Sequence, residues 1–257
     1  MRAIAAGLSD VGKQRVHNED RFILLPEFSV YVVADGMGGH QSGEVASRMA
    51  ASSIASYFRN GEGKAELNGS TPLGDRLRAA VTQANAKIFA RADDSRAHRG
   101  MGTTVVAAAF HKESGVFHVA HAGDSRCYRL RRGHLEQLTR DHSLVSDALL
   151  ERPDLSATDL AYLPRNVITR ALGIAPTVDV ELRVERSEPG DVYLLCSDGL
   201  HGLVSDEELA EILEGTAVLT EACAALVDRA NAAGGKDNIT AVLVRIEHDD
   251  EPWRAGR

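Results

Sequence analysis

The sequence predicts an α+β domain in which helices cover antiparallel β-sheets. Strand-like segments occur in consecutive sets and helix-like segments in consecutive pairs. This order differs from the regular strand–helix alternation that is typical of parallel sheets. No linker divides the 257 residues, so we expect a single domain over residues 1–247, followed by a charged, frayed tail over 248–257.

The strands are predicted from short segments rich in apolar, β-branched and aromatic residues. Residues 2–8 are expected to form an edge strand. Residues 21–25 and 29–34 predict a hairpin, because Pro26 and Glu27 separate them. Further strands are expected over residues 103–110, 116–121, 127–130, 178–184, 191–196 and 239–246.

The first pair of helices is predicted between the early and middle strands. Six apolar residues recur on one helical face: Val45, Ala46, Met49, Ala50, Ile54 and Tyr57. The second helix is expected to begin with Thr71 as N-cap and Pro72 in the first helical position. Its apolar stripe extends from Leu73 to Ile88.

A second pair of helices is predicted near the C-terminus. Ser205 and Glu208 have the spacing of a capping box, which predicts a helix that continues to Leu213. Thr220 is expected to cap the next helix, which ends at about Ala233. Between the middle and late strands, residues 142–165 follow no regular pattern, so we expect an irregular segment with short helical turns.

The composition excludes several classes of protein. Lys plus Arg is 29 and Asp plus Glu is 37, so the formal net charge is 29 − 37 = −8. Nucleic-acid binding, which needs clustered basic residues, is not expected. Three cysteines far apart in the sequence argue against a disulfide framework. Without an apolar stretch near 20 residues or a signal peptide, we expect no membrane span and a cytoplasmic location.

Acidic residues follow the ends of several predicted strands. Asp35, Asp124 and Asp198 each follow an apolar segment and precede a glycine or a serine. Two further acidic clusters are Asn18-Glu19-Asp20 and Asp237-Asn238. A single Asp-Gly pair is commonly a turn. Several carboxylates on rigid strand ends, however, favour Mg²⁺ or Mn²⁺, in a site with two ions roughly 3.5–4 Å apart.

Seven short motifs occur in an order that resembles one enzyme family. They are RVHNED at 15–20, DGMGGH at 35–40, GMGTT at 100–104, GDSR at 123–126, LTRDHS at 138–143, SDGL at 197–200 and KDNIT at 236–240. Together they resemble the metal-dependent Ser/Thr protein phosphatases (type 2C, or PPM), and the DGMGGH form resembles the bacterial branch. The resemblance covers about residues 5–245 and implies a four-layer α-β-β-α sandwich of two antiparallel sheets flanked by helix pairs.

The resemblance also implies a set of metal ligands. Asp35 would bridge two Mn²⁺ or Mg²⁺ ions, and the Gly36 carbonyl would bind one of them. Asp198 and Asp237 would complete the first metal site. Glu19 would reach the other ion, directly or through water.

Other residues acquire supporting or substrate-binding roles from the same resemblance. Asp124 would help Asp198 to hold a third, weaker metal ion. Asp20 would lie behind Glu19, and Asn238 would support its neighbour in the chain. Arg15 would bind the substrate phosphate, whose charge is close to −2 at neutral pH. A metal-activated water would attack phosphorus in line, without a covalent enzyme intermediate.

The resemblance leaves two candidates for the general acid. The eukaryotic branch has a histidine after the Asp-Gly pair, where this sequence has Met37. Either His40 or a metal-bound water could protonate the leaving oxygen. Residues 142–165 correspond to the variable flap beside the active site in the family, and two readings stay open: substrate selection, or a solvated loop. The single tryptophan, Trp253, receives no role.

Three other functions compete with a protein phosphatase. A metal-dependent hydrolase of small phosphate esters would need the same ligands. A phosphoprotein-binding pseudophosphatase would have lost carboxylates, and none is missing. A cysteine phosphatase would use Cys223 and Arg229, but the residues between them read as helix interior. We therefore expect a monomeric signalling enzyme that acts on phosphorylated Ser/Thr proteins, which a cognate Ser/Thr kinase would supply.

Overall fold

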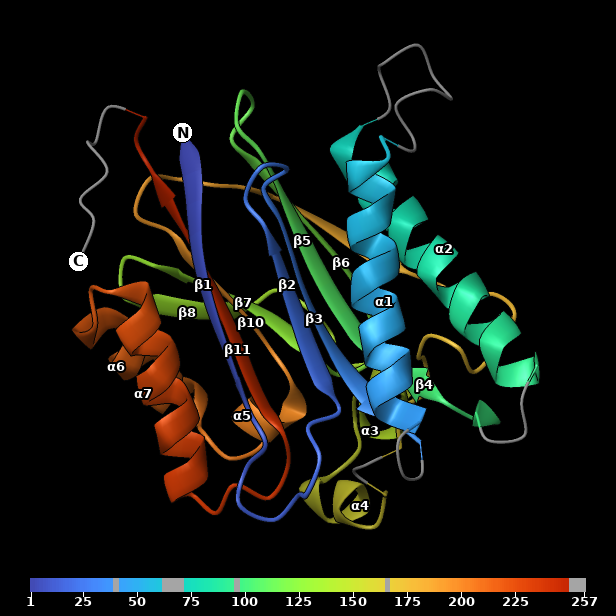
Figure 1. Cartoon of the computed structure of the whole chain (residues 1–257). Helices are drawn as coiled ribbons and strands as arrows, with labels where there is room; N and C mark the ends of the chain where they lie inside the picture. Colours follow the sequence, from blue (N-terminus) through green and yellow to red (C-terminus); the bar gives the residue numbers. More distant parts are fainter. Residues whose placement is uncertain (39–41, 62–71, 95–97, 165–166, 250–257) are drawn as a thin grey trace.

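The computed structural model describes residues 1–38, 42–61, 72–94, 98–164 and 167–249. Two antiparallel sheets form its centre (Figure 1). The strands of the first sheet are β2 (Asp20–Leu25), β3 (Val30–Met37), β4 (Gly102–Thr103), β5 (Val105–His111), β6 (Val116–Ala122) and β9 (Glu181–Arg186). Those of the second are β1 (Arg2–Asp10), β7 (Arg126–Arg131), β8 (His134–Gln137), β10 (Val192–Cys196) and β11 (Ile239–Glu247). The strand orders are β2-β3-β5-β6-β9, with β4 paired to β3, and β1-β11-β10-β7-β8.

Helices lie in pairs on the outer face of each sheet (Figure 1). Helices α1 (Ser42–Arg59) and α2 (Leu73–Asp94) pack on the first sheet, and α6 (Asp206–Gly215) and α7 (Leu219–Ala232) pack on the second. The predicted four-layer α-β-β-α sandwich is therefore confirmed. No described helix is long and apolar enough to cross a membrane.

The side chains of the strands alternate between two buried surfaces. Along β3, Val30 and Val32 pack beneath the helices, whereas Tyr31 and Val33 point between the sheets. Successive residues of a strand point to opposite faces, which explains how strands buried on both sides read as continuous apolar segments. The layer between the sheets also contains Tyr193 of β10, whose ring stacks on the ring of Phe117 of β6, with centroids 3.8 Å apart.

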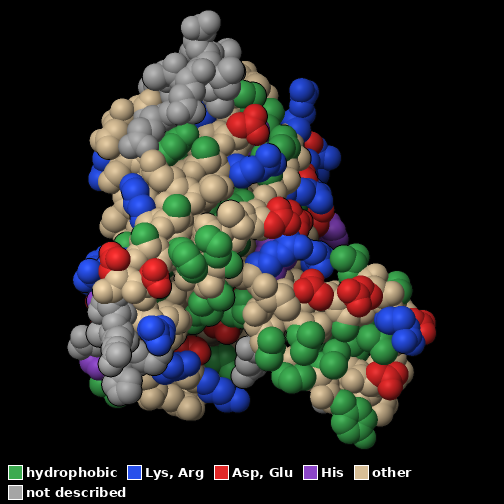
Figure 2. Space-filling model, turned by 90° about the vertical axis from the view of Figure 1, so that its right-hand side faces the viewer, with side chains coloured by type: hydrophobic (Ala, Val, Ile, Leu, Met, Phe, Trp, Pro, Cys, Tyr) green, Lys and Arg blue, Asp and Glu red, His purple; other side chains and the backbone are tan. Residues whose placement is uncertain are grey.

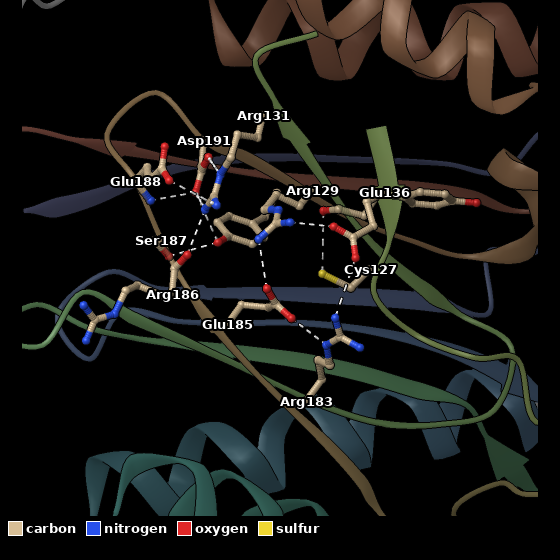
Figure 3. Close-up of polar contacts among 12 residues, drawn as sticks. Cys127, Arg129, Arg131, Glu136, Arg183, Glu185, Arg186, Ser187, Glu188 and Asp191 are labelled. Atoms are coloured by element: carbon tan, nitrogen blue, oxygen red, sulfur yellow. Dashed lines mark hydrogen bonds and ion pairs between the residues drawn. The ribbon is translucent and has the colours of Figure 1, made fainter. Parts of the chain in front are cut away.

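Ion pairs join the two sheets at one edge (Figure 3). Arg129 of β7 pairs with Glu136 of β8 at 2.5 Å and with Glu185 of β9 at 2.9 Å, so one guanidinium bridges strands of different sheets. Nearby, Arg131 pairs with buried Asp191 at 2.6 Å. These contacts hold the edge of the sandwich together, away from the carboxylates singled out above.

Several predicted boundaries were wrong. The strand expected over 103–110 is divided at Thr104 into β4 and β5, although the Thr104 N–H still donates to the Asp35 carbonyl of β3. The final helix starts at Leu219, so Thr220 lies inside it, and the N-cap Val218 offers no side-chain bond. The short strand β8 was not predicted, since its sequence, His-Leu-Glu-Gln, has no β-branched residue. Thr71, the expected N-cap of α2, lies outside the described residues.

The segment predicted to be irregular contains two short helices, α3 (Leu144–Glu151) and α4 (Ala157–Ala161). Together with α5 (Asp198–His201), they lie at the end of the sandwich opposite the N-terminus (Figure 1). Figure 2 shows hydrophobic side chains gathered on a projection at this end of the molecule. The most exposed large apolar residues of the segment are Leu150 and Tyr162, which are 65% and 82% exposed.

Candidate active site

The predicted carboxylates come from separate elements that meet at one end of the sandwich. Asp20 starts β2 and Asp35 lies near the end of β3, and the antiparallel register places the two directly opposite each other. Asp198 starts α5 directly after β10 and Ser197, and Asp237 precedes β11. Because strand residues alternate in direction, Asp20 and Asp35 point into the layer between the sheets, like Phe22 and Val33.

Asp20 is the most buried of these carboxylates and joins the two sheets. Its Oδ2 atom accepts hydrogen bonds from Ser197 Oγ and Thr240 Oγ1, both at 2.7 Å. Burial raises the pKa of Asp20 to about 7, and the charges of Asp198 and Asp237 add to the shift, although the two hydroxyl bonds oppose it. The side chain is only 1% exposed, so its ionised form is costly without a cation nearby.

Its neighbours have raised pKa values for the same reason. Burial raises the pKa of Asp35 well above the usual range, and the charges of Asp20, Asp198 and Asp124 raise it further. Burial and the Asp237 charge raise the pKa of Asp198. Burial, then the Asp198 charge, raises the pKa of Asp124 to about 7. The cluster thus holds more carboxylates than can be ionised together in the bare protein.

The donor set fits divalent metal ions. In this cluster, three buried carboxylate oxygens have no hydrogen-bond partner among the described residues: Oδ1 of Asp20, Oδ1 of Asp124 and Oδ1 of Asp198. Buried polar atoms are normally paired, so unpaired carboxylate oxygens gathered in one cluster favour a cation close to them. Carboxylate oxygens suit hard ions such as Mg²⁺ and Mn²⁺ better than Zn²⁺.

The loop between β1 and β2 brings Arg15 and Glu19 to the cluster. Arg15 Nη2 lies 2.7 Å from Asp237 Oδ2, and its side chain is half exposed. Asn238 orders the loop, because its Oδ1 accepts the Glu19 N–H at 2.8 Å while its Nδ2 donates to the carbonyls of Val11 and His17. Burial raises the pKa of Glu19. Asn238 therefore supports the site through the loop as well as through its neighbour Asp237.

Two glycines allow the backbone to pack closely behind the carboxylates. A Cβ at Gly36 would overlap the Gly43 carbonyl and lie 2.7 Å from that of Glu19. A Cβ at Gly199 would overlap the Asn238 carbonyl. The Asp-Gly pairs are thus explained by close backbone approach, and neither glycine has a positive φ.

The structure brings together every predicted site residue that it describes: Arg15, Glu19, Asp20, Asp35, Gly36, Asp124, Asp198, Asp237 and Asn238. His40, the candidate proton donor, lies outside the described residues, as does Trp253. Met37 is the partly buried last residue of β3.

Sequence reasoning missed the polar residues that hold the carboxylates. Ser197 and Thr240 bond to Asp20, as described above. Thr104 Oγ1 lies 2.7 Å from Ser125 Oγ, next to Asp124. His201 Nε2 lies 3.0 Å from the Asp124 carbonyl oxygen. All of these residues except His201 stand inside the motifs quoted above, and Ser125 and Ser197 stand directly beside an acidic residue, which was the available signal.

Comparisons with known proteins agree with this geometry. A model of the family "Protein phosphatase 2C" matches residues 13–243. The chain is 38% identical over 240 residues to the serine/threonine phosphatase stp of Listeria monocytogenes, covering 92% of this chain and 93% of the relative. It is 33% identical to the protein phosphatase PhpP of Streptococcus pneumoniae, covering 95% of this chain and 97% of the relative.

Solved structures give the same result. The serine/threonine phosphatase PstP/Ppp of Mycobacterium tuberculosis superposes with a TM-score of 0.84 at 34% identity, covering 96% of this chain and all of that one. The catalytic domain of PstP in complex with two manganese ions has a TM-score of 0.80 at 34% identity, covering 96% and 99% of the two chains. The resemblance seen in the motifs is confirmed, and the chain belongs to the protein phosphatase 2C family.

Proposed function

We propose that this protein is a metal-dependent phosphatase that removes phosphate from phosphoserine and phosphothreonine in proteins. One observation carries the proposal: buried carboxylates from separate elements meet at one end of the sandwich and raise one another's pKa values. Divalent cations would relieve this repulsion and would attract a doubly charged phosphate ester. The relatives named as serine/threonine phosphatases support the substrate class.

The metal ligands we propose are those expected from the sequence. Asp35 would bind two ions, the Gly36 carbonyl and Glu19 would each bind one of them, and Asp198 and Asp237 would complete the set. The two manganese ions of the PstP catalytic domain support this number. Bound ions would lower the pKa of water and offset charge on the transferring phosphoryl group.

We assign Asp124 to a third and weaker ion, together with Asp198. Asp124 belongs to a separate loop, and its Oδ1 is a buried oxygen without a partner among the described residues. The charge of Asp198 contributes to the raised pKa of Asp124, which supports a cation shared by the two carboxylates. Asp20 and Asn238 would orient the ligands without binding metal.

Arg15 would bind the phosphate. Its guanidinium is half exposed beside Asp237, so a small side-chain movement would transfer it from the carboxylate to the substrate. Its planar fork can donate two hydrogen bonds to one phosphate. For the leaving oxygen, His40 remains the candidate proton donor on sequence grounds, with a metal-bound water as the alternative.

The setting of the enzyme is also a proposal. We expect a monomer with one domain over residues 1–247, and a flap over 142–165. We also propose cytoplasmic signalling, in which the enzyme reverses phosphorylation by a cognate Ser/Thr kinase.

The test is a panel of substrates measured with Mn²⁺, with Mg²⁺ and with a chelator. Phosphoserine and phosphothreonine peptides should be hydrolysed with either metal and not with the chelator. Preference for small phosphate esters would favour the alternative of a small-ester hydrolase. Tight peptide binding without turnover would indicate a pseudophosphatase, and absence of both would contradict the proposal.

A further inference from the structure

Two histidines from distant parts of the chain hold the loop that carries Asp124: His142, just before α3, and His201, in α5. His142 and Gly123 are joined twice: the His142 N–H donates to the Gly123 carbonyl at 3.0 Å, and the Gly123 N–H donates to His142 Nδ1 at 3.1 Å. On the other side, His201 Nε2 lies 3.0 Å from the Asp124 carbonyl oxygen. The Gly123 N–H is therefore held by the His142 ring and the Gly123 carbonyl by the His142 backbone, while the Asp124 carbonyl is held by the His201 ring.

The bonds define the protonation state of each ring. His142 Nδ1 accepts an N–H, so its proton is on Nε2, which lies 3.3 Å from Glu181 Oε2. The Asp124 carbonyl can only accept, so His201 carries its proton on Nε2. Burial lowers the pKa of both rings to about 4, with smaller contributions from nearby His121 and Arg126, so both are neutral at neutral pH. His142 thus holds the loop with Nδ1 as a hydrogen-bond acceptor, whereas His201 holds it with Nε2 as a donor.

A metal role for His142 is disfavoured, although His121, His142 and Glu181 lie close enough to form a candidate site among the described residues. The rings of the two histidines are stacked, with centroids 4.6 Å apart and planes within 7°. Nitrogen lone pairs lie in the ring plane, so nearly parallel rings cannot both point at one ion. Both nitrogens of His142 are also occupied, Nδ1 by the Gly123 N–H and Nε2 by the Glu181 carboxylate.

His142 also closes the base of the segment 142–165. Its carbonyl accepts the Thr169 N–H at 2.9 Å, and the Leu144 N–H donates to the Val167 carbonyl at 2.9 Å. The two ends of the flap are thus joined at His142, and this junction is bonded to the loop of Asp124. A movement of the flap base would therefore be transmitted to Asp124.

We infer that His142 is a positioning residue that couples the flap to the Asp124 loop, and that His201 positions the same loop from α5. The inference rests on the proposed role of Asp124 at the weaker metal site. It predicts that loss of either ring bond weakens metal binding there and leaves the tight sites unchanged. Supporting groups that orient ligands typically change metal affinity or activity by roughly 10–100-fold.

Amide substitutions give the decisive test, because each amide replaces one ring nitrogen. The Oδ1 atom of asparagine is as many bonds from Cα as Nδ1 of histidine, and Nε2 of glutamine matches Nε2. His142→Asn should therefore retain the weak site, and His142→Gln should lose it. The order should be reversed at the second position, where His201→Gln should retain it and His201→Asn should lose it. A purely space-filling role would not produce this crossed pattern.

The readouts are Mn²⁺ calorimetry, hydrogen exchange of the Gly123 amide, and turnover as a function of metal concentration. His142→Gln should weaken the low-affinity binding step roughly tenfold or more and speed exchange of the Gly123 amide. His121→Leu is the matched control, since it removes a buried ring of the same stack whose Nε2, within the described part of the chain, bonds to the Arg140 carbonyl and not to the loop of Asp124.

Asp124→Asn separates failure of the inference from failure of the proposed function. If Asp124→Asn leaves the weak site intact, the assignment of Asp124 is wrong. If Asp124→Asn abolishes the weak site but both His142 amides behave like wild type, the coupling through His142 is refuted. Equal loss of the weak metal site in His142→Asn and His142→Gln, with the same loss in His121→Leu, would also refute the coupling, because packing alone would explain the result.

Discussion

Asp20 and Asp35 lie directly opposite each other on β2 and β3, with both carboxylates in the layer between the two sheets. Like charges in opposite positions of an antiparallel pair are destabilising. Burial also raises the pKa of both groups, so their ionised forms are costly in the folded chain. This pair of carboxylates therefore destabilises the metal-free protein, and we interpret it as part of a site that binds cations.

The first prediction concerns the pH dependence of the metal-free protein. Asp20 has a pKa of about 7 in the folded chain and roughly 3.9 when unfolded. Between these values the folded state binds more protons, so the Asp20 contribution to stability decreases as pH rises from about 4 to about 7. Asp20→Asn should thus be more stable than wild type at pH 8 in chelator, by on the order of a few kcal/mol, and similar at pH 4.

Chemical unfolding at several pH values measures this difference, and subtraction of the wild-type curve removes the contributions of the buried histidines. Added Mn²⁺ should shrink or reverse the advantage of the Asp20→Asn variant, since cations favour the ionised carboxylates. An advantage that did not depend on pH would show that Asp20 is not protonated in the folded protein.

The second prediction concerns the proposed tight metal ligands. Asp35→Ala and Asp198→Ala should each lower turnover of a phosphopeptide by at least roughly 10²–10³-fold, because they remove charge that holds cations at the reacting phosphate. Circular dichroism should show an unchanged fold. In chelator, Asp35→Ala should be more stable than wild type, since a repelling carboxylate is removed. Retained turnover in either variant would contradict the two-metal site.

The third prediction separates the weaker site from the tight ones. Asp124→Ala should lower turnover while calorimetry finds the tight Mn²⁺ sites unchanged, because Asp124 lies on a loop of its own after β6. Higher metal concentrations should not restore the missing binding step. If the tight sites were lost as well, Asp124 would belong to the same site as Asp35.

The fourth prediction concerns Arg15. Arg15→Ala should raise KM for a phosphopeptide roughly 10–100-fold, the range expected when charge-assisted hydrogen bonds are lost. Arg15→Lys should recover only part of this, since an ammonium lacks the planar fork. Arg132→Ala is the matched control, because Arg132 is an exposed arginine paired with Glu188 in the polar network away from the carboxylate cluster. An unchanged KM in Arg15→Ala would remove Arg15 from the phosphate site.

Much of the fold could be predicted, because the information is local. Apolar segments and capping signals identified most strands and helices, and aspartates after strand ends identified the site. Failures have local causes too. Thr220 has the chemistry of an N-cap, but helix α7 starts one residue earlier. Strand β8 forms by pairing with β7, although its own residues have low strand propensity.

The supporting contacts of the site could not be predicted, because they join distant residues. Ser197 and Thr240 reach Asp20 across 177 and 220 positions of sequence. A hydroxyl or an imidazole beside an acidic residue does not reveal which distant group it will contact. The sequence motifs therefore located the carboxylates, whereas the arrangement of the sheets was needed to find what orders them.

The last prediction tests the close backbone packing behind Asp198. Gly199→Ala places a Cβ against the Asn238 carbonyl, so α5 or the start of β11 must shift. Overpacking of this kind typically costs about 1–3 kcal/mol of unfolding free energy. Gly215→Ala is the matched control, since Gly215 also lies in a helix and its Cβ would meet nothing within 4 Å. This substitution should be neutral or slightly stabilising.

Because the shift moves Asp198 relative to Asp237, Gly199→Ala should also weaken Mn²⁺ binding, whereas Gly215→Ala should not. Thermal unfolding and calorimetry measure both effects, and wild-type metal affinity in Gly199→Ala would show that this packing does not position the ligands.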